Sequence, residues 1–316
     1  MTPPLVSVIM SAHNAARYLD QCMRSVLEQS FRDFECLVVD DGSTDNTAKI
    51  LMRYVQADSR VKVLSNGVKQ GYTRCLNRLV EVALGTYLAR MDADDVAYPD
   101  RFQKQVEFLD AHPECVIVGG QVEFVDEDGD TLCEFSVPLE HEQIEQRLWR
   151  GDSLALVHPA VMMRTAAVRR VGGYREETAY SDDLDLYLRL AEIGRLANLP
   201  DRVLKYRRHP DSVTAVGSGE LDRRRKLSIL REAAERRGMA GRWIELGEFP
   251  VARTRAEWHA EWAFRIWKRG GDLRVARKHL WRAIRAGPFL RPVWRSFVCV
   301  LFRTTPAAHG SRAHPG

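Results

Sequence analysis

Paired cysteines and long apolar runs are both missing from this sequence. Its six cysteines are scattered, with no CxxC pair and no metal-ligand spacing, which favours reduced thiols over a zinc site or a disulfide framework. A transmembrane helix needs about 20 apolar residues in a row, and no such run occurs. The start, MTPPLVSVIMSAHN, has no basic stretch before an apolar one. We therefore expect no signal peptide and a cytoplasmic location.

Charge is unevenly distributed along a chain of otherwise ordinary globular composition. Hydrophobic residues make up 45% of the sequence and charged residues 28%. Residues 251–316 contain 14 Lys and Arg against 3 Asp and Glu, whereas residues 1–250 contain 33 against 40. The two parts of the chain are therefore expected to meet different partners.

The N-terminal half alternates between apolar runs and helical patterns. The runs LVSVIMSA and FECLVVDD predict strands that are buried on both faces. After each run, apolar residues at helical spacing predict a helix, with Asn14 capping the first and Ser43 or Thr44 the second. Repeated strand and helix units predict an α/β fold with a mostly parallel, Rossmann-like, doubly wound sheet.

Later segments suggest where the chain divides. The strand CVIVGGQVEFVD is expected to pair with TLCEFSV across the turn EDGD, and residues 1–218 to form one domain. Residues 219–303 are predicted to form an Arg-rich and Trp-rich helical extension, including one helical hairpin with a Gly-Gly-Asp turn. Residues 304–316 are expected to be disordered.

Polar side chains gather at the predicted carboxyl ends of the strands, where open parallel sheets bind ligands. The strand ends deliver one hydroxyl and five carboxylates: Ser11, Asp40, Asp41, Asp92, Asp94 and Asp95. Converging carboxylates repel one another unless cations or donor groups balance them, so a ligand is expected there. Ser43 and Asp45 have the simpler interpretation of turn and capping residues.

The spacing of Asp92 and Asp94 favours a divalent cation. Two oxygen ligands two residues apart can face the same side of an extended segment, which suits Mg²⁺ or Mn²⁺ that also binds phosphate oxygens. Such a pair alone is commonly just solvated, and its place at a strand end opposite Asp41 is what favours a metal. Asp100 follows Pro99 and is expected to begin the next helix instead.

Six motifs follow one another in a fixed order over about residues 5–215. They are VSVIMSAHN, SVLEQSFRDFECLVVDDGSTDNT, MDADDVAYPDRFQKQVEFLDAHP, HPAVMMR, VGGYRE with SDDLDLYLRL, and YRRHPDSVT. Together they resemble the family 2 inverting glycosyltransferases of the GT-A fold. The resemblance implies that Asp41 accepts a hydrogen bond from the nucleotide base, with Ser11 and Ala12 lining the same pocket. It also implies a metal and donor site at Asp92 and Asp94, with Asp95 as a further candidate ligand.

The same resemblance implies a catalytic base. SDDLDLYLRL stands where many members have Glu-Asp followed by Tyr-Asp-Leu, so Asp183 matches the base and Asp182 replaces the usual Glu. The alternative for these acids, favoured for Asp185, is a first-turn position that suits the helix dipole. His158 and His209 match positions near the acceptor and the diphosphate, with a packed or loop histidine as an equal interpretation.

The implied reaction is metal-dependent, inverting transfer of a sugar from a nucleotide-diphosphate donor to a hydroxyl of a glycan or lipid-linked acceptor. Arg207 and Arg208 are candidates for the diphosphate, with ordinary surface charge expected for one of them. Uracil or thymine is the expected base, and guanine stays open. The alternatives are a sugar-phosphate nucleotidyltransferase, for which SAHNAARYLD has too few glycines, and a non-catalytic nucleotide-sugar-binding module, which would lack a base such as Asp183.

The basic C-terminal helices leave three partners open. Trp and Leu on one face with Arg on the others favour an anionic surface on the inner face of the cell membrane, which suits a lipid-linked acceptor. An intramolecular helical cap or a protein contact is the second interpretation. Nucleic acid is the third, and it is not expected.

Overall fold

The computed structural model describes residues 3–210, 220–239, 241, 246 and 254–302, which group into two compact units. The first takes the described residues of Met1–Glu123, Phe135–Arg207 and Gly217–Pro250, and the second those of Phe124–Glu134, Arg208–Val216 and Val251–Gly316. This division differs from the boundary expected after residue 218. The tail at 304–316 lies outside the described residues.

The strands form one mixed sheet in the order β3-β2-β1-β4-β8-β6-β9-β5, with β7 paired to β6. Their bounds are β1 (Val6–Ala12), β2 (Phe34–Asp41), β3 (Val61–Asn66), β4 (Tyr87–Asp92), β5 (Val96–Ala97), β6 (Cys115–Val125), β7 (Thr131–Phe135), β8 (Met162–Arg164) and β9 (Arg195–Arg207). The strands β1 to β4 pair in parallel, as expected, whereas β8 runs antiparallel to β4 and β6.

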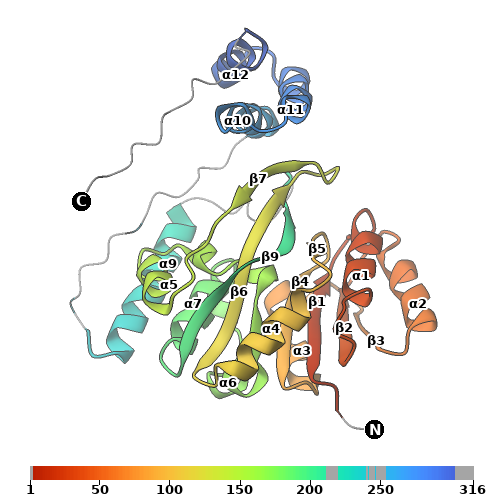
Figure 1. Cartoon of the computed structure of the whole chain (residues 1–316), viewed down its shortest axis with the longest axis vertical. Coiled ribbons are helices and arrows are strands. Elements are labelled where there is room, and N and C mark those ends of the chain that lie inside the picture. Colours follow the sequence, from red (N-terminus) through yellow and green to blue (C-terminus); the bar gives the residue numbers. More distant parts are fainter. Residues whose placement is uncertain (1–2, 211–219, 240, 242–245, 247–253, 303–316) are drawn as a thin grey trace. The chain divides into compact units, whose positions relative to one another are not determined.

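Helices cover the sheet, and Figure 1 shows α1 and α2 beside the parallel strands. The helices of the first unit are α1 (Leu19–Leu27), α2 (Thr47–Ala57), α3 (Tyr72–Val82), α4 (Arg101–Ala111), α5 (His141–Leu148), α6 (Thr165–Arg170), α7 (Asp182–Leu190) and α9 (Glu220–Arg236). Short 3-10 turns are η1 (Ser153–Ala155), η2 (His158–Ala160) and η3 (Glu176–Thr178). Because α9 packs on α7, it belongs with the first unit.

The predicted caps of the first two helices are wrong for a shared reason. Asn14 lies four residues before the N-cap of α1, with φ 51°, and its Oδ1 accepts a hydrogen bond from Thr44 N at 2.8 Å. Ser43 Oγ in turn accepts from Asn14 N at 3.0 Å, and neither Ser43 nor Thr44 caps α2. These polar residues join the loop after β1 to the loop after β2. Asp45 does bond Thr47 N at 2.9 Å, as a capping residue would.

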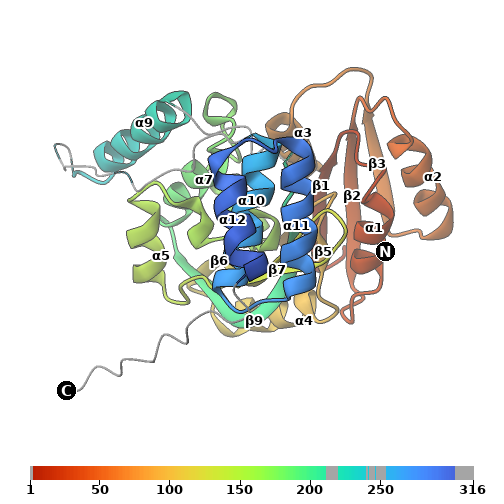
Figure 2. The same ribbon diagram turned by 90° about the horizontal axis from the view of Figure 1, so that it is seen from above.

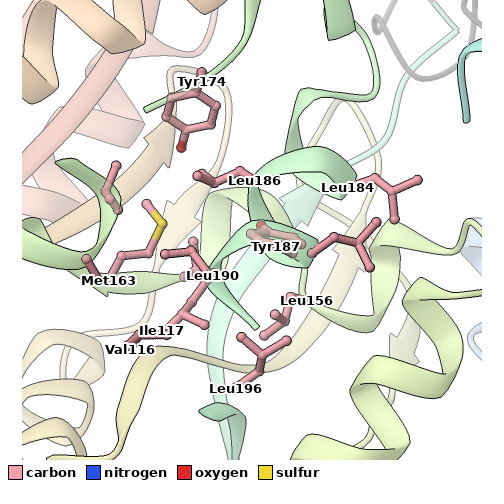
Figure 3. Packing of buried hydrophobic residues seen from close by; sticks show 14 of the residues in the cluster. Val116, Ile117, Leu156, Met163, Tyr174, Leu184, Leu186, Tyr187, Leu190 and Leu196 are labelled. Carbon is pink, nitrogen blue, oxygen red and sulfur yellow. The ribbon is translucent and has the colours of Figure 1, made fainter. Parts of the chain in front are cut away.

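The core of the first unit surrounds α7, which is buried on nearly every side. Figure 3 shows the packed side chains: Val116 and Ile117 of β6, Met163 of β8, Leu156, Tyr174, Leu196, and Leu184, Leu186, Tyr187 and Leu190 of α7. Such burial rigidly fixes the first turn of α7, where three acids lie.

The second unit joins the β6–β7 turn to three C-terminal helices, α10 (Arg255–Lys268), α11 (Leu273–Ala286) and α12 (Arg291–Phe302). The expected helical hairpin is present as α10 and α11, and Asp272 in its turn accepts a hydrogen bond from Arg274 N. The ring of Phe124 lies 6.3 Å from that of Trp262 on α10. Among the described residues, no helix is both long and apolar enough to cross a membrane.

Asp185 should be a structural acid, as its first-turn position suggested. Its fully buried carboxylate accepts hydrogen bonds from Arg189 Nε at 2.9 Å and Arg175 Nε at 3.1 Å. We expect Asp185→Ala to lower the free energy of unfolding by about 3–5 kcal/mol in urea titrations, because it leaves the buried charge of Arg189 without a carboxylate. Glu176→Ala, which breaks an exposed pair with Arg74, is the control and should cost less than about 1 kcal/mol. Equal losses would contradict the assignment.

Candidate active site

The strand ends meet at one edge of the sheet, as the sequence predicted. In the parallel register Ser11 of β1 pairs with Asp92 of β4, and Ala12 pairs with Asp40 of β2. Asp41, the next residue after Asp40, is the last residue of β2. Residues separated by about 80 positions in sequence therefore present their side chains at the same carboxyl edge.

Three acids after β4 form a candidate metal site. The carboxylates of Asp92, Asp94 and Asp95 each offer an oxygen within 4.8 Å of the others. Burial, followed by the charges of Asp94 and Asp92, raises the pKa of Asp95 well above its ordinary value. Asp95 Oδ2 has no hydrogen-bond partner among the described residues. An all-oxygen donor set with an unsatisfied buried oxygen fits a hard divalent cation such as Mg²⁺ or Mn²⁺.

Arg207, the last residue of β9, donates hydrogen bonds to this acidic loop. Its backbone N donates to Asp95 Oδ1 at 2.7 Å, its Nε donates to the Asp94 carbonyl at 2.7 Å, and its Nη2 reaches Gln21. Arg207 is only 2% exposed, so the structure places it as a support for the acids. Its predicted contact with a diphosphate stays a prediction.

Arg208 and His209 belong to the second unit, unlike Arg207. The guanidinium of Arg208 lies 5.5 Å from the ring centre of Phe124, in the β6–β7 turn. Both residues are partly exposed. The three neighbouring candidates thus have different surroundings, and the role predicted for His209 toward the diphosphate stays a prediction.

Arg90 is a site residue that the sequence reasoning missed. It lies two residues before Asp92 on β4, so both side chains are on the same face of the strand. Arg90 Nη1 is 2.5 Å from Asp92 Oδ1, and the guanidinium is almost completely buried. Its Nε has no hydrogen-bond partner among the described residues. A lone arginine inside the apolar run YLARM was the available signal, because a buried cation needs a nearby anion.

His158 is packed between two phenols near Arg90. His158 Nε2 lies 2.9 Å from Tyr174 Oη, and Nδ1 lies 3.3 Å from Tyr72 Oη. Burial, and then the charge of Arg90, lowers the pKa of His158 well below its ordinary value. A neutral imidazole offers one donor and one acceptor, so it can bond both phenols. The role predicted for His158 near the acceptor or the diphosphate stays a prediction.

The other two acids of the α7 first turn differ in exposure. Asp182 is 2% exposed, and its Oδ2 has no hydrogen-bond partner among the described residues. Asp183 is partly exposed, and its Oδ1 accepts a hydrogen bond from Leu184 N at 2.7 Å. Burial raises the pKa of Asp183, and hydrogen bonds from Ser153 and Leu184 oppose that rise. Asp183 is therefore the acid of this pair that a substrate can reach.

The metal-site loop and α7 are connected through aromatic residues. The pKa of Tyr174 is raised by burial, lowered in part by Arg90, and raised by the charges of Asp182, Asp183 and Asp92. Arg90, which pairs with Asp92, lies 5.7 Å from the ring centre of Tyr72. Tyr72 contacts His158, whose ring lies 6.2 Å from that of Tyr187 on α7, so a chain of contacts links the metal-site loop to α7. Burial and the charge of Asp182 raise the pKa of Tyr72, the charge of Arg90 lowers it, and the charge of Asp183 raises it further. Sequence reasoning predicted the acids and missed the aromatic residues between them.

Asp41 is already engaged by the chain. Its carboxylate accepts hydrogen bonds from Gln70 N at 2.7 Å, Asn66 Nδ2 at 2.8 Å and Gly71 N at 2.9 Å. Burial alone would raise the pKa of Asp41, but these donors lower it, so the group is ionised. Asp41 fixes the segment after β3, and a base could use only the remaining acceptor capacity of the carboxylate.

A second acidic group, Asp126, Asp128 and Asp130 in the β6–β7 turn, has a structural explanation. The Nζ of Lys278 on α11 contacts all three carboxylates, and His279 Nε2 lies 3.1 Å from Asp126 Oδ2. The ammonium group takes the place that a metal ion would occupy. These acids join the turn to α11 within the second unit.

Comparisons with known proteins agree on one family. The model of the family described as "Glycosyl transferase family 2" matches residues 7–172. The O-antigen biosynthesis glycosyltransferase WbnJ of Escherichia coli is 31% identical over 212 residues, covering 66% of this chain and 81% of that protein. The amylovoran biosynthesis glycosyltransferase AmsE of Erwinia amylovora is 30% identical over 212 residues, covering 66% and 78%.

Solved structures share the fold at low sequence identity. S. aureus TarS, residues 1–349, in complex with UDP has a TM-score of 0.53 at 18% identity, covering 92% of this chain and 91% of that chain. The mannosyltransferase PcManGT from Pyrobaculum calidifontis, in complex with GDP-Man and Mn²⁺, has a TM-score of 0.53 at 18% identity, covering 94% and 79%.

Asp182 should make stability depend on pH. Burial, and then the charge of Asp183, raises the pKa of Asp182 from 3.8 to about 7. Between those values the unfolded chain has lost this proton while the folded chain keeps it. The Asp182 contribution therefore falls with rising pH by about 1.4 kcal/mol per unit and becomes constant above pH 7. We expect the stability of Asp182→Asn relative to the parent to increase from pH 4 to pH 7 in metal-free urea titrations.

A matched control separates this effect from a general pH response. The pKa of Asp58 is lowered by its pairing with Arg60. Asp58→Asn should therefore show no comparable relative gain over the same range. Parallel stability curves for Asp182→Asn and the parent would contradict the assignment.

Proposed function

This chain belongs to glycosyl transferase family 2 and is a glycosyltransferase of the GT-A fold; we propose that it moves a sugar from a nucleotide-diphosphate donor to a glycan or lipid-linked hydroxyl. The observation that carries the proposal is the cluster of Asp92, Asp94 and Asp95 at the strand ends, which contacts through Arg90, Tyr72 and His158 link to α7, where Asp183 is partly exposed. Family relatives named for O-antigen and amylovoran biosynthesis support a surface polysaccharide as the product.

Asp183 is the proposed base, and the transfer inverts the anomeric configuration. Its carboxylate takes the proton of the acceptor hydroxyl while that oxygen bonds the anomeric carbon and the bond to the diphosphate breaks. Base catalysis of this kind contributes about 10²- to 10⁴-fold. Partial exposure favours Asp183 over buried Asp182 for this role.

A divalent cation, Mg²⁺ or Mn²⁺, is the proposed cofactor, and it would neutralise charge on the leaving diphosphate. Arg90 holds Asp92, and the Arg207 backbone holds Asp95. We propose that Asp92 and Asp94 hold the cation, with Asp95, whose Oδ2 has no hydrogen-bond partner among the described residues, as a further ligand. The Mn²⁺ in the PcManGT complex is consistent with this chemistry.

A uridine nucleotide is the proposed donor carrier, with the base beside Ser11, Ala12 and Asp41 at the ends of β1 and β2. The UDP complex of TarS supports this choice, and the GDP-Man complex of PcManGT keeps guanine as the alternative. A thermal-shift comparison of UDP-sugars with GDP-mannose, in the presence of Mn²⁺, distinguishes them, because the preferred carrier stabilises the protein more.

Asp183→Asn should abolish transfer while keeping nucleotide affinity, because the amide cannot accept the acceptor proton but preserves the shape of the site. UDP release with and without an acceptor measures activity, and calorimetry with UDP and Mn²⁺ measures binding. We expect turnover to fall by at least about 10²-fold. Glu81→Gln, an exposed acid on α3, is the control and should behave like the parent. Parent-like turnover of Asp183→Asn would overturn the assignment of the base.

Asp94→Ala should weaken nucleotide binding only when a divalent cation is present. Loss of a carboxylate that would hold the cation should lower metal occupancy, and a bound cation would supply charge neutralisation to the diphosphate. Calorimetry with UDP should show at least a tenfold loss, about 1.4 kcal/mol, in Mn²⁺ and little change in EDTA. Glu81→Ala is again the matched control. An equal loss in both buffers would indicate a folding defect and count against metal ligation.

A further inference from the structure

Most aromatic side chains of the C-terminal helices lie inside the second unit. Trp258, Trp262 and Trp267 of α10 are only 6–7% exposed. The Trp258 ring lies 5.7 Å from that of His279 on α11, and Trp262 faces Phe124. The expectation that the aromatic faces of both hairpin helices meet a membrane is therefore wrong for α10, whose tryptophans stabilise the unit itself.

A different set of large apolar side chains remains exposed on α11, α12 and the connection between them. Trp281 is 56% exposed, Phe289 92%, Trp294 50% and Val298 53%. Figure 2 shows α11 and α12 side by side in front of α10. Isolated exposed apolar residues are ordinary, but four on two adjacent helices and their connection need an explanation.

Arginines accompany these residues on the solvent-facing stripes of both helices. On α11, Arg274, Arg277 and Arg285 lie seven and four residues before Trp281 and four after it, which is the spacing of one helical face. On α12, Arg291 and Arg295 flank Trp294. We call these five arginines, together with Trp281, Phe289, Trp294 and Val298, the α11–α12 face.

Negative charge is absent from the helices that carry this face. Residues 273–302 contain no Asp or Glu. Arg274 pairs with Asp272 and Arg295 approaches Glu261 at 4.0 Å, whereas Arg277, Arg285 and Arg291 have no carboxylate partner among the described residues. Strong positive charge beside exposed tryptophan matches the boundary between anionic headgroups and acyl chains.

We propose that the α11–α12 face binds the surface of a bilayer containing anionic phospholipid, with the aromatic side chains at headgroup depth. No described helix can span a membrane, so the contact is interfacial. Exposed Val298 favours lipid over nucleic acid, since an aliphatic side chain neither stacks on a base nor binds a phosphate. Binding to the bilayer surface would bring the proposed transferase to a lipid-linked acceptor. This benefit rests on the proposed function, whereas the observations that support membrane binding do not.

Sedimentation of the full chain with vesicles tests the proposal. The protein should bind vesicles of phosphatidylcholine and phosphatidylglycerol in equal parts, bind phosphatidylcholine alone at least about tenfold more weakly, and dissociate as salt rises. The triple variant Trp281→Ala, Phe289→Ala, Trp294→Ala should lose at least about tenfold in affinity. Arg285→Gln and Arg291→Gln should each lose about fivefold, which is the contribution of one charge near an anionic surface.

Arg53→Gln, an exposed arginine on α2, is the charge-matched control and should bind vesicles like the parent. The substituted aromatic residues are at least half exposed and the arginines are exposed, so each variant should still unfold in one cooperative thermal transition. Parent-like vesicle binding by the triple variant would overturn the proposal. So would preferential binding to duplex DNA, or a dimer in sedimentation equilibrium that the triple variant loses. Vesicle binding is measured without donor or metal, so its failure leaves the transfer proposal intact, and a failed Asp183→Asn test leaves the surface proposal intact.

Discussion

Carboxylates that lie close together at the edge of a buried sheet repel one another unless positive charge or hydrogen-bond donors lie beside them. The candidate active site of this protein depends on such neighbours. The parallel half of the sheet supplies the acids, and Arg90, from inside β4, pairs with Asp92. Another cation comes from β9, which ends with the backbone and guanidinium of Arg207 against Asp95 and Asp94. The antiparallel half of the sheet thus adds a positive charge and hydrogen bonds to acids that the parallel half supplies.

Much of this site could be predicted from sequence because strand ends and acids occur together in the chain. Continuous apolar runs gave β1, β2 and β4, and the parallel rule brought Ser11, Asp41 and Asp92 to one edge. Arg90 and Tyr174 could not be found in this way. Their importance comes from contacts across the fold, with Asp92 in one case and His158 in the other. The predicted cap at Asn14 failed likewise, because its side chain bonds another loop.

In the second unit, the net charge counted from the sequence is larger than the charge that is exposed to a binding partner. Lys278 and Arg282 count toward the basic C-terminal segment, yet both pair with acids of the β6–β7 turn. His279 contacts Asp126 and also lies 3.0 Å from His259, whose pKa falls to about 4 through burial and the neighbouring His279. Part of the positive charge therefore stabilises the unit, and only the remainder faces outward.

The pairing of the β6–β7 turn with α11 also has a consequence for synthesis. The β6–β7 turn is synthesised long before the helices that complete its unit. Asp126 is therefore ionised and without its partners His279 and Lys278 until the chain is nearly complete. A nascent chain, or one cut after residue 250, has this acidic loop without the Lys278, His279 and Arg282 that pair with it. Cutting there removes the C-terminal helices and also leaves the β6–β7 turn without the helix that it pairs with. A loss of activity or of localisation in such a chain could therefore come from either change.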